Sequence, residues 1–428
     1  MNCARWVVTL LSRHGDHFHG ANHPMTADIQ SKKSSVKRPH VAVVYHFFAH
    51  YREPIVERLA RSEVADFVFC GDDHDYENTI KKANFSPKVD FRFCRTRKIF
   101  RSIMWQSGII RVALSREFDQ IIFLGNAFWI ATWIAAIMAR LTGKRVLYWS
   151  HGFLQAPQGM KGLLRRSFFA LAHAHLFYGR FAKQEAITIG WDPSRLHVVG
   201  NSLNLDAQTR ERNLVKDGEL AALRQRLFKD PSLPIAFCSC RLQPSKRLDL
   251  LVSALAKLAQ QGTRANLLIV GDGSQRADLE RLAKESGIDA HFTGACYDDA
   301  QLARYICASD VTVSPGFVGL TAIHSMVFGV PVITHDTMAK QAPEVEAIIP
   351  GVTGDLFALG NVDDLARCMK SWLSPQRDRE RTRQACIQLV ERFWSPAFQQ
   401  MMIEHAVLGY PADDLLFLRQ PKVRSEPT

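Results

Sequence analysis

The sequence predicts an α/β protein made of two doubly wound domains. Three observations predict it: 428 residues are too many for one compact core, short apolar runs alternate with segments of helix length, and this alternation stops in a polar stretch and then begins again. Parallel sheets covered by helices have this pattern, because each crossover places a helix on a face of the sheet. Ligands of such sheets bind at the carboxyl ends of the strands.

The first series of elements begins with a strand at 41–45. A loop at 46–53 follows it, and Pro54 suits the first turn of a helix that runs to about residue 61. Further strands are expected at 66–70, 91–94, 120–124, 146–149, 176–178 and 197–199. The apolar region 121–141 is interrupted by Gly125-Asn126, which favours a strand, a loop and a buried helix over a transmembrane span.

The second series follows a polar helical stretch that ends at Asp230-Pro231. Its strands are expected at 235–239, 267–270, 290–292, 311–313 and 332–334. We therefore predict a first domain at 40–205, completed by a C-terminal helix at 395–418, then a linker at 206–232, a second domain at 233–394 and a tail at 419–428. Residues 1–39 are expected to be a disordered leader, and Met25 is an alternative start.

The composition of the chain limits the kinds of molecule that it can bind. The formal net charge is +12, which calls for an acidic partner such as nucleic acid, anionic lipid or a phosphorylated substrate. The sequence has no helix-turn-helix signature, zinc-finger spacing or aromatic RNA-binding strand, so no nucleic acid partner is expected. The nine cysteines lie mostly in apolar runs without C-x-x-C spacing, which favours reduced thiols in a cytosolic protein and no metal site.

A glycine-bearing turn follows the strand at 311–313. Ser314-Pro315 leads into it, Gly316 and Gly319 let the backbone approach a ligand closely, and a helix begins directly afterwards. The first N–H groups of a helix have no partner inside it. We therefore expect an anion to bind at this turn.

Two cations follow the strand at 235–239. Arg241 and Lys246 are five residues apart across a turn that contains Pro244, so both can point at one place above the sheet. A fixed pair of cations can neutralise the charge that develops on a leaving diphosphate without a metal. A solvated, basic helix start explains the same residues. The turn Gly271-Asp272-Gly273 is less informative, because ordinary turns between strands and helices also use glycine.

The order of these motifs resembles the C-terminal domain of retaining GT-B glycosyltransferases of family 4. The resemblance covers residues 235–372 and consists of Arg241 and Lys246 followed by 269–273 (IVGDG), 292–294 (FTG), Ser314-Pro315, Gly319-Leu320, 329–333 (GVPVI), Pro343-Glu344 and 351–354 (GVTG). It implies the GT-B fold, in which two Rossmann-like domains face each other across a cleft. It also implies a glycosyltransferase (EC 2.4). Such an enzyme uses a nucleotide sugar as co-substrate and needs no cofactor.

The family pattern also assigns roles. Arg241 and Lys246 would bind the donor diphosphate, and His151, at the carboxyl end of the strand at 146–149, would contact the sugar. Core packing is the alternative for His151. The remaining donor-binding positions would be Gly271, Gly319, Leu320 and Thr321, the last three through their backbone N–H groups. Transfer would proceed with retention and without a metal, and the leaving phosphate would deprotonate the acceptor hydroxyl.

One departure from the family concerns the donor. The family carries two glutamates, eight positions apart, around the Gly-Leu turn, and this chain has Gly316 and His324 there. The first normally touches the sugar and the second touches the ribose. His324 is expected to replace the second contact as a neutral hydrogen-bonding group, unless it is a core or surface histidine. Gly316 is expected to leave room for an unusual donor, and Glu344 is the carboxylate expected to compensate.

The N-terminal half offers acceptor-side candidates. His50 and Arg52 lie in the loop after the first strand, where they would bind the acceptor or its phosphate, or only form a capping loop for the helix at Pro54. The segment Lys161 to Lys183 is basic, and Leu164, Phe168, Leu171 and Ala172 share one helical face. An interfacial helix on anionic lipid has this pattern, and so does a core-packed helix with a solvated basic face.

Together these features predict a bacterial glycosyltransferase of surface polysaccharide biosynthesis (capsule, O-antigen or exopolysaccharide). Its acceptor would be lipid-linked or a saccharide. The protein would be cytoplasmic, with peripheral attachment to the cytoplasmic face of the inner membrane. Two alternatives keep the donor site but not the transfer: a sugar-nucleotide epimerase or hydrolase of the same fold, and a non-catalytic nucleotide-sugar-binding protein.

Overall fold

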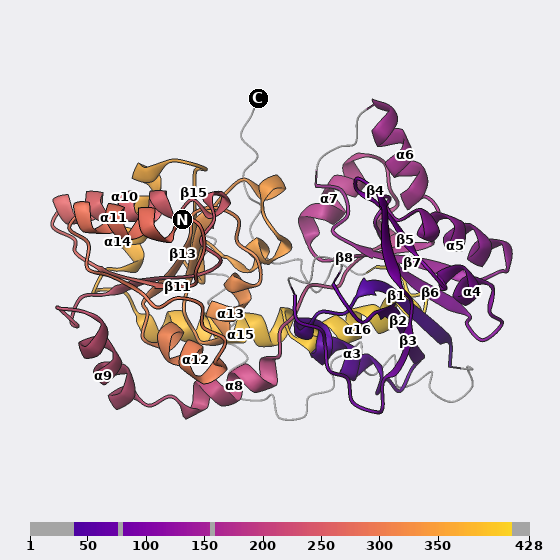
Figure 1. The fold of residues 1–428 in the computed structure, drawn as a ribbon, viewed down its shortest axis with the longest axis horizontal. Coiled ribbons are helices and arrows are strands. Elements are labelled where there is room, and N and C mark those ends of the chain that lie inside the picture. The colour runs from indigo at the N-terminus through magenta and orange to yellow at the C-terminus, as the bar shows by residue number, and fades with distance from the viewer. Residues whose placement is uncertain (1–37, 76–79, 155–158, 413–428) are drawn as a thin grey trace. The chain divides into compact units, whose positions relative to one another are not determined.

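A computed structural model describes residues 38–75, 80–154 and 159–412. The chain divides into two compact units, residues 1–200 with 396–428 and residues 201–395 (Figure 1). Most of the predicted leader, with Met25, and all of the predicted tail lie outside the described residues. At the end of the leader the guanidinium of Arg38 donates to the carbonyl oxygen of Ser62 at 2.7 Å and pairs with Asp66.

The first unit is built on a parallel sheet of seven strands in the order β3-β2-β1-β6-β7-β8-β9. In register, Ala42 lies opposite Val68 on one side and Ile121 on the other. The central strands are buried on both faces, which explains why they read as continuous apolar runs. The strands are β1 (His40–Phe47), β2 (Asp66–Asp72), β3 (Asp90–Phe93), β6 (Gln120–Leu124), β7 (Arg145–Ser150), β8 (Ala174–Phe177) and β9 (Leu196–Val198).

Helices cover this sheet. The region 121–141 is β6, a loop and α5, as predicted, and no helix of the described residues is both long enough and apolar enough to cross a bilayer. The last helix of the unit comes from the far end of the chain and packs on α3, β8 and β9. The helices are α3 (Glu53–Leu59), α4 (Ile109–Leu114), α5 (Ile130–Leu141), α6 (Gly159–Phe169), α7 (Arg180–Thr188) and α16 (Pro396–Val407), with short 3-10 turns at His50–Arg52 and Pro193–Arg195.

An antiparallel hairpin in the first unit was not predicted. It consists of β4 (Thr96–Phe100) and β5 (Ile103–Gln106), and Arg101 at its turn has a left-handed φ of 49°. Ile99 and Phe100 in β4 are each 60% exposed. The strand therefore lacks the buried face from which the other strands were recognised.

The second unit is built on a parallel sheet of six strands in the order β12-β11-β10-β13-β14-β15. Phe237 lies opposite Leu268 on one side and Thr312 on the other. Five of these strands were predicted, and the edge strand β15 was not. The strands are β10 (Ile235–Ser239), β11 (Asn266–Val270), β12 (Ala290–Phe292), β13 (Val311–Ser314), β14 (Val332–His335) and β15 (Gly354–Phe357).

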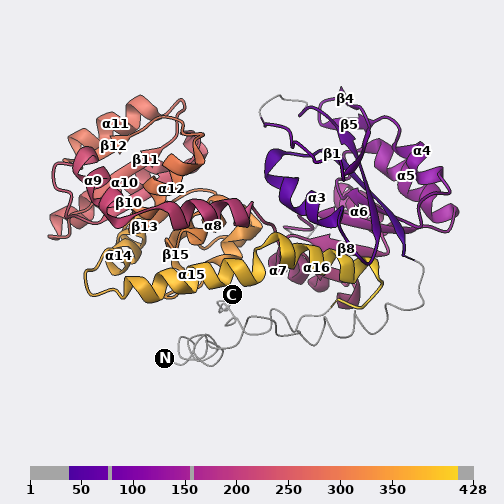
Figure 2. The same cartoon turned by 90° about the horizontal axis from the view of Figure 1, so that it is seen from below.

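Residues 206–232, predicted as a linker, form two helices in the second unit. The first packs against α12 (Asp299–Cys307) and α13 (Thr321–Val327) and the second against α12. Figure 2 shows both helices on the side of the unit that carries α12. The helices of the unit are α8 (Leu205–Leu214), α9 (Asp217–Leu227), α10 (Leu248–Gln260), α11 (Arg276–Glu285), α12 (Asp299–Cys307), α13 (Thr321–Val327), α14 (Val362–Trp372) and α15 (Arg379–Phe393). Short 3-10 turns lie at Pro244–Lys246, Met338–Lys340 and Pro343–Ala347.

The strand order reverses once in each sheet, between β1 and β6 in the first unit and between β10 and β13 in the second. At such a switch point the neighbouring crossovers leave in opposite directions, which opens a crevice at the carboxyl ends of the strands. The loop after β1 carries Arg52, the loop after β10 carries Lys246, and the turn after β13 carries Gly316. The fold thus positions these three predicted residues at switch points.

Candidate active site

The loop after β10 holds Lys246 against the turn after β13. Lys246 lies in the short 3-10 turn, and Arg247 adopts a left-handed φ of 49°, which redirects the chain into α10. The Lys246 Nζ donates to the carbonyl oxygen of Phe317 at 2.9 Å and lies 4.8 Å from the centre of the Phe317 ring. The structure therefore brings Lys246 to the predicted anion-binding turn.

The two loops also meet through their backbones. The N–H of Gly316 donates to the carbonyl oxygen of Lys246 at 3.1 Å. A Cβ atom at position 316 would lie 2.3 Å from the carbonyl oxygen of Ser245 and 2.9 Å from the carbonyl carbon of Lys246. The expectation that Gly316 leaves room for an unusual donor is wrong, because backbone atoms of the neighbouring loop fill that space.

The buried side chain of Gln341 supports this turn through hydrogen bonds, and it was not predicted. The side-chain oxygen of Gln341 accepts the N–H of Val318 at 2.8 Å, and its amide nitrogen donates to the Thr334 hydroxyl at 2.9 Å. That hydroxyl donates to the carbonyl oxygen of Ser314 at 2.7 Å. Since Gln341 lies 23 residues after Val318, no local spacing could have linked them.

Backbone donors remain available at this turn. Within the described chain, the N–H groups of Gly319 and Leu320 make no hydrogen bond. The helix α13 starts at the next residue, Thr321, whose hydroxyl makes a 3.4 Å contact to the carbonyl oxygen of Ser239. Two free N–H groups beside the ammonium of Lys246 form a place where a phosphate can bind.

The glycine turn after β11 supports the β10 loop. Gly271 has φ 145°, and a Cβ there would lie 1.9 Å from the carbonyl oxygen of Cys240. The N–H of Leu242 donates to the carbonyl oxygen of Asp272 at 2.9 Å. The two loops are therefore packed backbone to backbone, which explains the need for glycine here.

Arg241 is exposed and makes no hydrogen bond or ion pair with any described residue. The adjacent cation Arg247 differs, because it pairs with Asp249 at 3.0 Å. Arg241 is thus a cation without a protein partner near the loop that carries Lys246, and Arg247 is already neutralised.

The two remaining donor-side candidates are buried to different degrees. His324 is half-buried in α13, and its burial, weakly opposed by Asp299, lowers its pKa to about 4, so the ring is neutral at pH 7. Glu344 is 2% exposed and accepts a hydrogen bond from Asn201 at 2.7 Å. Glu344 therefore holds the Asn201 segment.

In the first unit the structure separates His50 from Arg52. His50 is exposed and contacts the carbonyl oxygen of Lys81 at 3.2 Å. Arg52 is buried, and its guanidinium donates to the hydroxyls of Tyr178 and, at 3.1 Å, Tyr45. The two residues are neighbours in sequence, yet only Arg52 lies among the strand ends.

His151 joins the Arg52 group instead. Its ring centre lies 4.7 Å from that of Tyr178, although the residue as a whole is exposed. Burial and the charge of Arg52 lower its pKa to about 4. Tyr45, Trp149 and Tyr178 were not predicted as site residues, because aromatic residues at the ends of buried strands look like core residues in the sequence.

The predicted membrane-facing side of the segment Lys161 to Lys183 is wrong for two of its four residues, Phe168 and Ala172. The segment forms α6, β8 and the start of α7, and Lys183 is 5% exposed. Phe168 and Ala172, on the predicted membrane face, are completely buried in the core. The strand in this segment was predicted at 176–178, and the error concerns the apolar face that precedes it.

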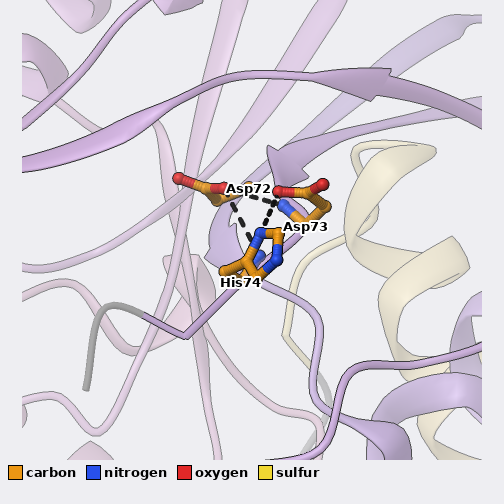
Figure 3. A group of neighbouring side chains, drawn as sticks. All are labelled: Asp72, Asp73 and His74. Carbon is orange, nitrogen blue, oxygen red and sulfur yellow. Dashed lines mark hydrogen bonds and ion pairs between the residues drawn. The ribbon is translucent and has the colours of Figure 1, made fainter. Parts of the chain in front are cut away.

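One acidic group has spacing that could hold a metal. Asp72, Asp73 and His74 lie together at the end of β2, with ligand atoms within 4.8 Å of one another (Figure 3). The Asp72 carboxylate already accepts the N–H groups of Asp73 and His74, at 2.8 and 3.3 Å, and that of Thr96 at 2.5 Å. These bonds explain the cluster as a stabilised loop, and nothing else marks it as a metal site.

The comparisons with known proteins agree with this geometry. Residues 221–388 match the family Glycosyl transferases group 1. A GDP-mannose-dependent alpha-(1-6)-phosphatidylinositol dimannoside mannosyltransferase of Mycobacterium tuberculosis is 31% identical over 165 residues, which are 38% of this chain and 41% of that protein. The chain spans between 31% and 46% of the length of the curated relatives that it matches.

Solved structures match over most of the chain. Anabaena HepE in complex with UDP and glucose has a TM-score of 0.60 at 16% identity, covering 87% of this chain and 100% of its own. The lipopolysaccharide outer core galactosyltransferase WaaB has a TM-score of 0.62 at 15% identity, covering 86% and 99%. The fold is therefore the GT-B fold that the sequence predicted, and residues 221–388 match a glycosyl transferases group 1 domain.

Proposed function

We propose that this protein is a glycosyltransferase whose second unit binds a nucleotide-sugar donor and whose first unit binds the acceptor. The observation that carries the proposal is the junction of Lys246 with the turn at Phe317, beside the unpaired N–H groups of Gly319 and Leu320. A cation and backbone donors at the switch point of a parallel sheet suit a nucleoside diphosphate. The UDP-bound structure of the same fold supports this donor class.

The same groups support a mechanism. Lys246 and Arg241 would neutralise the diphosphate as the bond to the sugar breaks, and the N–H groups at the turn would bind its oxygens. We propose that these protein cations make a metal unnecessary. The leaving phosphate would then take the proton of the acceptor hydroxyl, so the sugar is transferred with retention and no side-chain base is needed.

His324 and His151 would complete the donor site. The ring of His324 makes no hydrogen bond within the described chain and is neutral at pH 7, so it can read a ribose hydroxyl in place of the family's glutamate. We propose that His151 contacts the transferred sugar from the first unit.

We propose a lipid-linked or saccharide acceptor of a bacterial surface polysaccharide and a cytoplasmic enzyme that attaches to the inner membrane. A lipid acceptor, phosphatidylinositol dimannoside, is named for the mycobacterial relative. The chain has its own apolar surface for a bilayer on α6, where Met160, Leu163 and Leu164 are 86%, 66% and 59% exposed beside exposed Lys161. This surface shares Leu164 with the predicted face, whereas Phe168 and Ala172 of that face are buried.

Product analysis tests the transfer. The protein is incubated with UDP-, GDP-, dTDP- and CMP-sugars, with and without membrane extract as acceptor, in EDTA. Acceptor-dependent release of nucleotide with an unchanged anomeric configuration by NMR supports the proposal. Acceptor-independent turnover would instead indicate an epimerase or hydrolase, and nucleotide-sugar binding without turnover would indicate a binding protein.

Vesicle flotation tests the membrane contact. The wild type is expected to float with anionic vesicles at low salt, and a variant with Leu163→Gln and Leu164→Gln is expected to float several-fold less. Leu214→Gln is the matched control, since Leu214 is 67% exposed on the other unit. A wild type that stays in the supernatant would contradict the membrane proposal without touching the transfer.

A further inference from the structure

A cluster of buried nitrogen atoms without hydrogen-bond partners lies at the switch point of the first sheet. The Arg52 Nη1, the Trp149 Nε1 and the His46 Nδ1 are buried and have no hydrogen-bond partner among the described residues. Arg52 follows β1, and Trp149 lies near the carboxyl end of β7. The guanidinium carbon of Arg52 lies 5.2 Å from the centre of the Trp149 ring, so two N–H donors share one neighbourhood.

The charge of Arg52 is not balanced by a carboxylate. Among the described residues its side chain donates only to the hydroxyls of Tyr45 and Tyr178, and none of them forms an ion pair with it. Burial lowers the pKa of Arg52, but the oxygens of Tyr178, Tyr45 and Tyr51 together raise this pKa by more than burial lowers it. The guanidinium therefore stays charged. Burial raises the pKa of Tyr178, which therefore stays neutral.

The histidines nearby do not supply a counter-charge either. Burial and Arg52 lower the pKa of His46 to about 4, with Asp75 acting weakly against them, and the same two causes lower that of His151 to about 4. A buried cation without a paired carboxylate is costly, and an unpaired buried N–H adds to the cost. Such groups usually await a ligand or a water molecule.

We propose that this cluster binds a phosphoryl group of the acceptor, which makes the acceptor substrate a phosphate ester or diphosphate. This inference rests on the proposed function, because it names the class of the acceptor. The Arg52 guanidinium supplies the positive charge, and its Nη1 and the Trp149 Nε1 supply directional donors to the phosphoryl oxygens. A terminal phosphoryl group has three oxygens that can accept hydrogen bonds, whereas a carboxylate has two. The phosphoryl group therefore suits several donors that point at one place better than a carboxylate does.

The cluster borders residues that reach the surface of the unit. Arg52 keeps 8% of its surface exposed, the ring of Tyr51 beside it is half-buried, and exposed His151 packs on Tyr178. A phosphoryl group that enters beside His151 would place the ester it carries next to the residue proposed to contact the transferred sugar. The phosphoryl site at Arg52 and the transfer site at His151 would then lie side by side at the carboxyl ends of the first sheet.

Indole NMR tests the inference without an activity assay. The full chain is labelled with ¹⁵N-tryptophan, which gives eight indole signals from eight tryptophans, and the Trp149 signal is assigned by its absence in Trp149→Phe. Inorganic phosphate and pyrophosphate are titrated at constant ionic strength. We expect a saturable downfield shift of the Trp149 signal with phosphate or pyrophosphate, weakened about 10-fold in Arg52→Lys and absent in Arg52→Met.

The controls separate binding from folding and from donor binding. Lys246→Ala, in the other unit, should keep the full Trp149 shift. The phosphoryl site is therefore tested independently of the proposed donor site. Arg52→Met should keep the wild-type thermal midpoint or raise it, because it removes an unpaired buried cation. A large drop in that midpoint together with no phosphate effect on the wild type would make Arg52 a structural residue and overturn the inference.

Two further outcomes decide against it. A Trp149 shift produced by acetate but not by phosphate would assign a carboxylate-bearing acceptor instead. An equal shift in wild type and Arg52→Met would show that phosphate acts elsewhere. Once an acceptor is in hand, Arg52→Lys should raise its KM at least 10-fold and leave the KM of the donor unchanged.

Discussion

Gly316 gives the sharpest prediction about the donor site, because the space that a side chain would occupy at this position is filled by the loop after β10. A methyl group at this position would lie 2.3 Å from the carbonyl oxygen of Ser245, and real Cβ contacts do not fall below 3.0 Å. The β10 loop would have to move by about 0.7 Å, the difference between these two distances. Overpacking of this kind typically costs about 1–3 kcal/mol, and here it displaces the loop that carries Lys246.

Urea unfolding and calorimetric titration with nucleoside diphosphates measure both effects. Gly316→Ala should lower the free energy of unfolding of the second unit by about 1–3 kcal/mol and weaken nucleotide binding several-fold. Gly218→Ala is the matched control, because a Cβ there meets no atom within 4 Å and should leave both values unchanged or slightly better. Gly316→Glu, which restores the glutamate of the family, should be worse than alanine. A Gly316→Glu protein with wild-type stability and tighter donor binding would refute the packing argument.

Two other perturbations test the supports of the fold. Gln341→Leu should cost about 2–3 kcal/mol of unfolding free energy by urea titration, because the N–H of Val318 and the hydroxyl of Thr334 lose buried partners, whereas loss of less than 0.5 kcal/mol would show that the turn needs no such support. Burial, with smaller contributions from Arg195 and His197, lowers the pKa of His175 to about 3, so below pH 6.5 the unfolded chain takes up a proton that the folded chain cannot, and stability falls from pH 6.5 towards pH 3. His175→Phe should therefore remove about 2–3 kcal/mol of the stability lost between pH 7 and pH 4.5, and an unchanged loss would refute this assignment.

Most of the architecture could be predicted, because buried parallel strands are continuous apolar runs with helices between them. The central strands β1, β6, β7, β10 and β11 were predicted on this basis. The hairpin strand β4 escaped because its side chains face solvent and its basic residues read as a charge run. The predicted membrane face failed because a helical period alone does not show which side is covered: Leu164 is exposed, whereas Phe168 and Ala172 are buried in the core.

The candidate site was predictable only where a residue follows a strand end. Lys246 and the turn at Gly316 follow β10 and β13, which are neighbours in the sheet, so their meeting could be expected. Gln341 and the Arg52 cluster depend on contacts between distant segments, and such contacts leave no spacing in the sequence. The packing of Gly316 against Ser245, 71 residues earlier, is hidden for the same reason.

The most direct test of the donor site is nucleotide binding by Lys246→Ala with Arg247→Ala as its control. Both variants remove one cation from the same turn, but Arg247 is paired with Asp249 whereas Lys246 contacts the anion-binding turn. Calorimetry of the wild type should find one nucleoside diphosphate bound per chain. Lys246→Ala should weaken it by about 1.5–3 kcal/mol, roughly 10- to 150-fold, and Arg247→Ala should leave it unchanged. Equal affinity in Lys246→Ala and wild type, or loss of binding in both variants alike, would contradict the donor site.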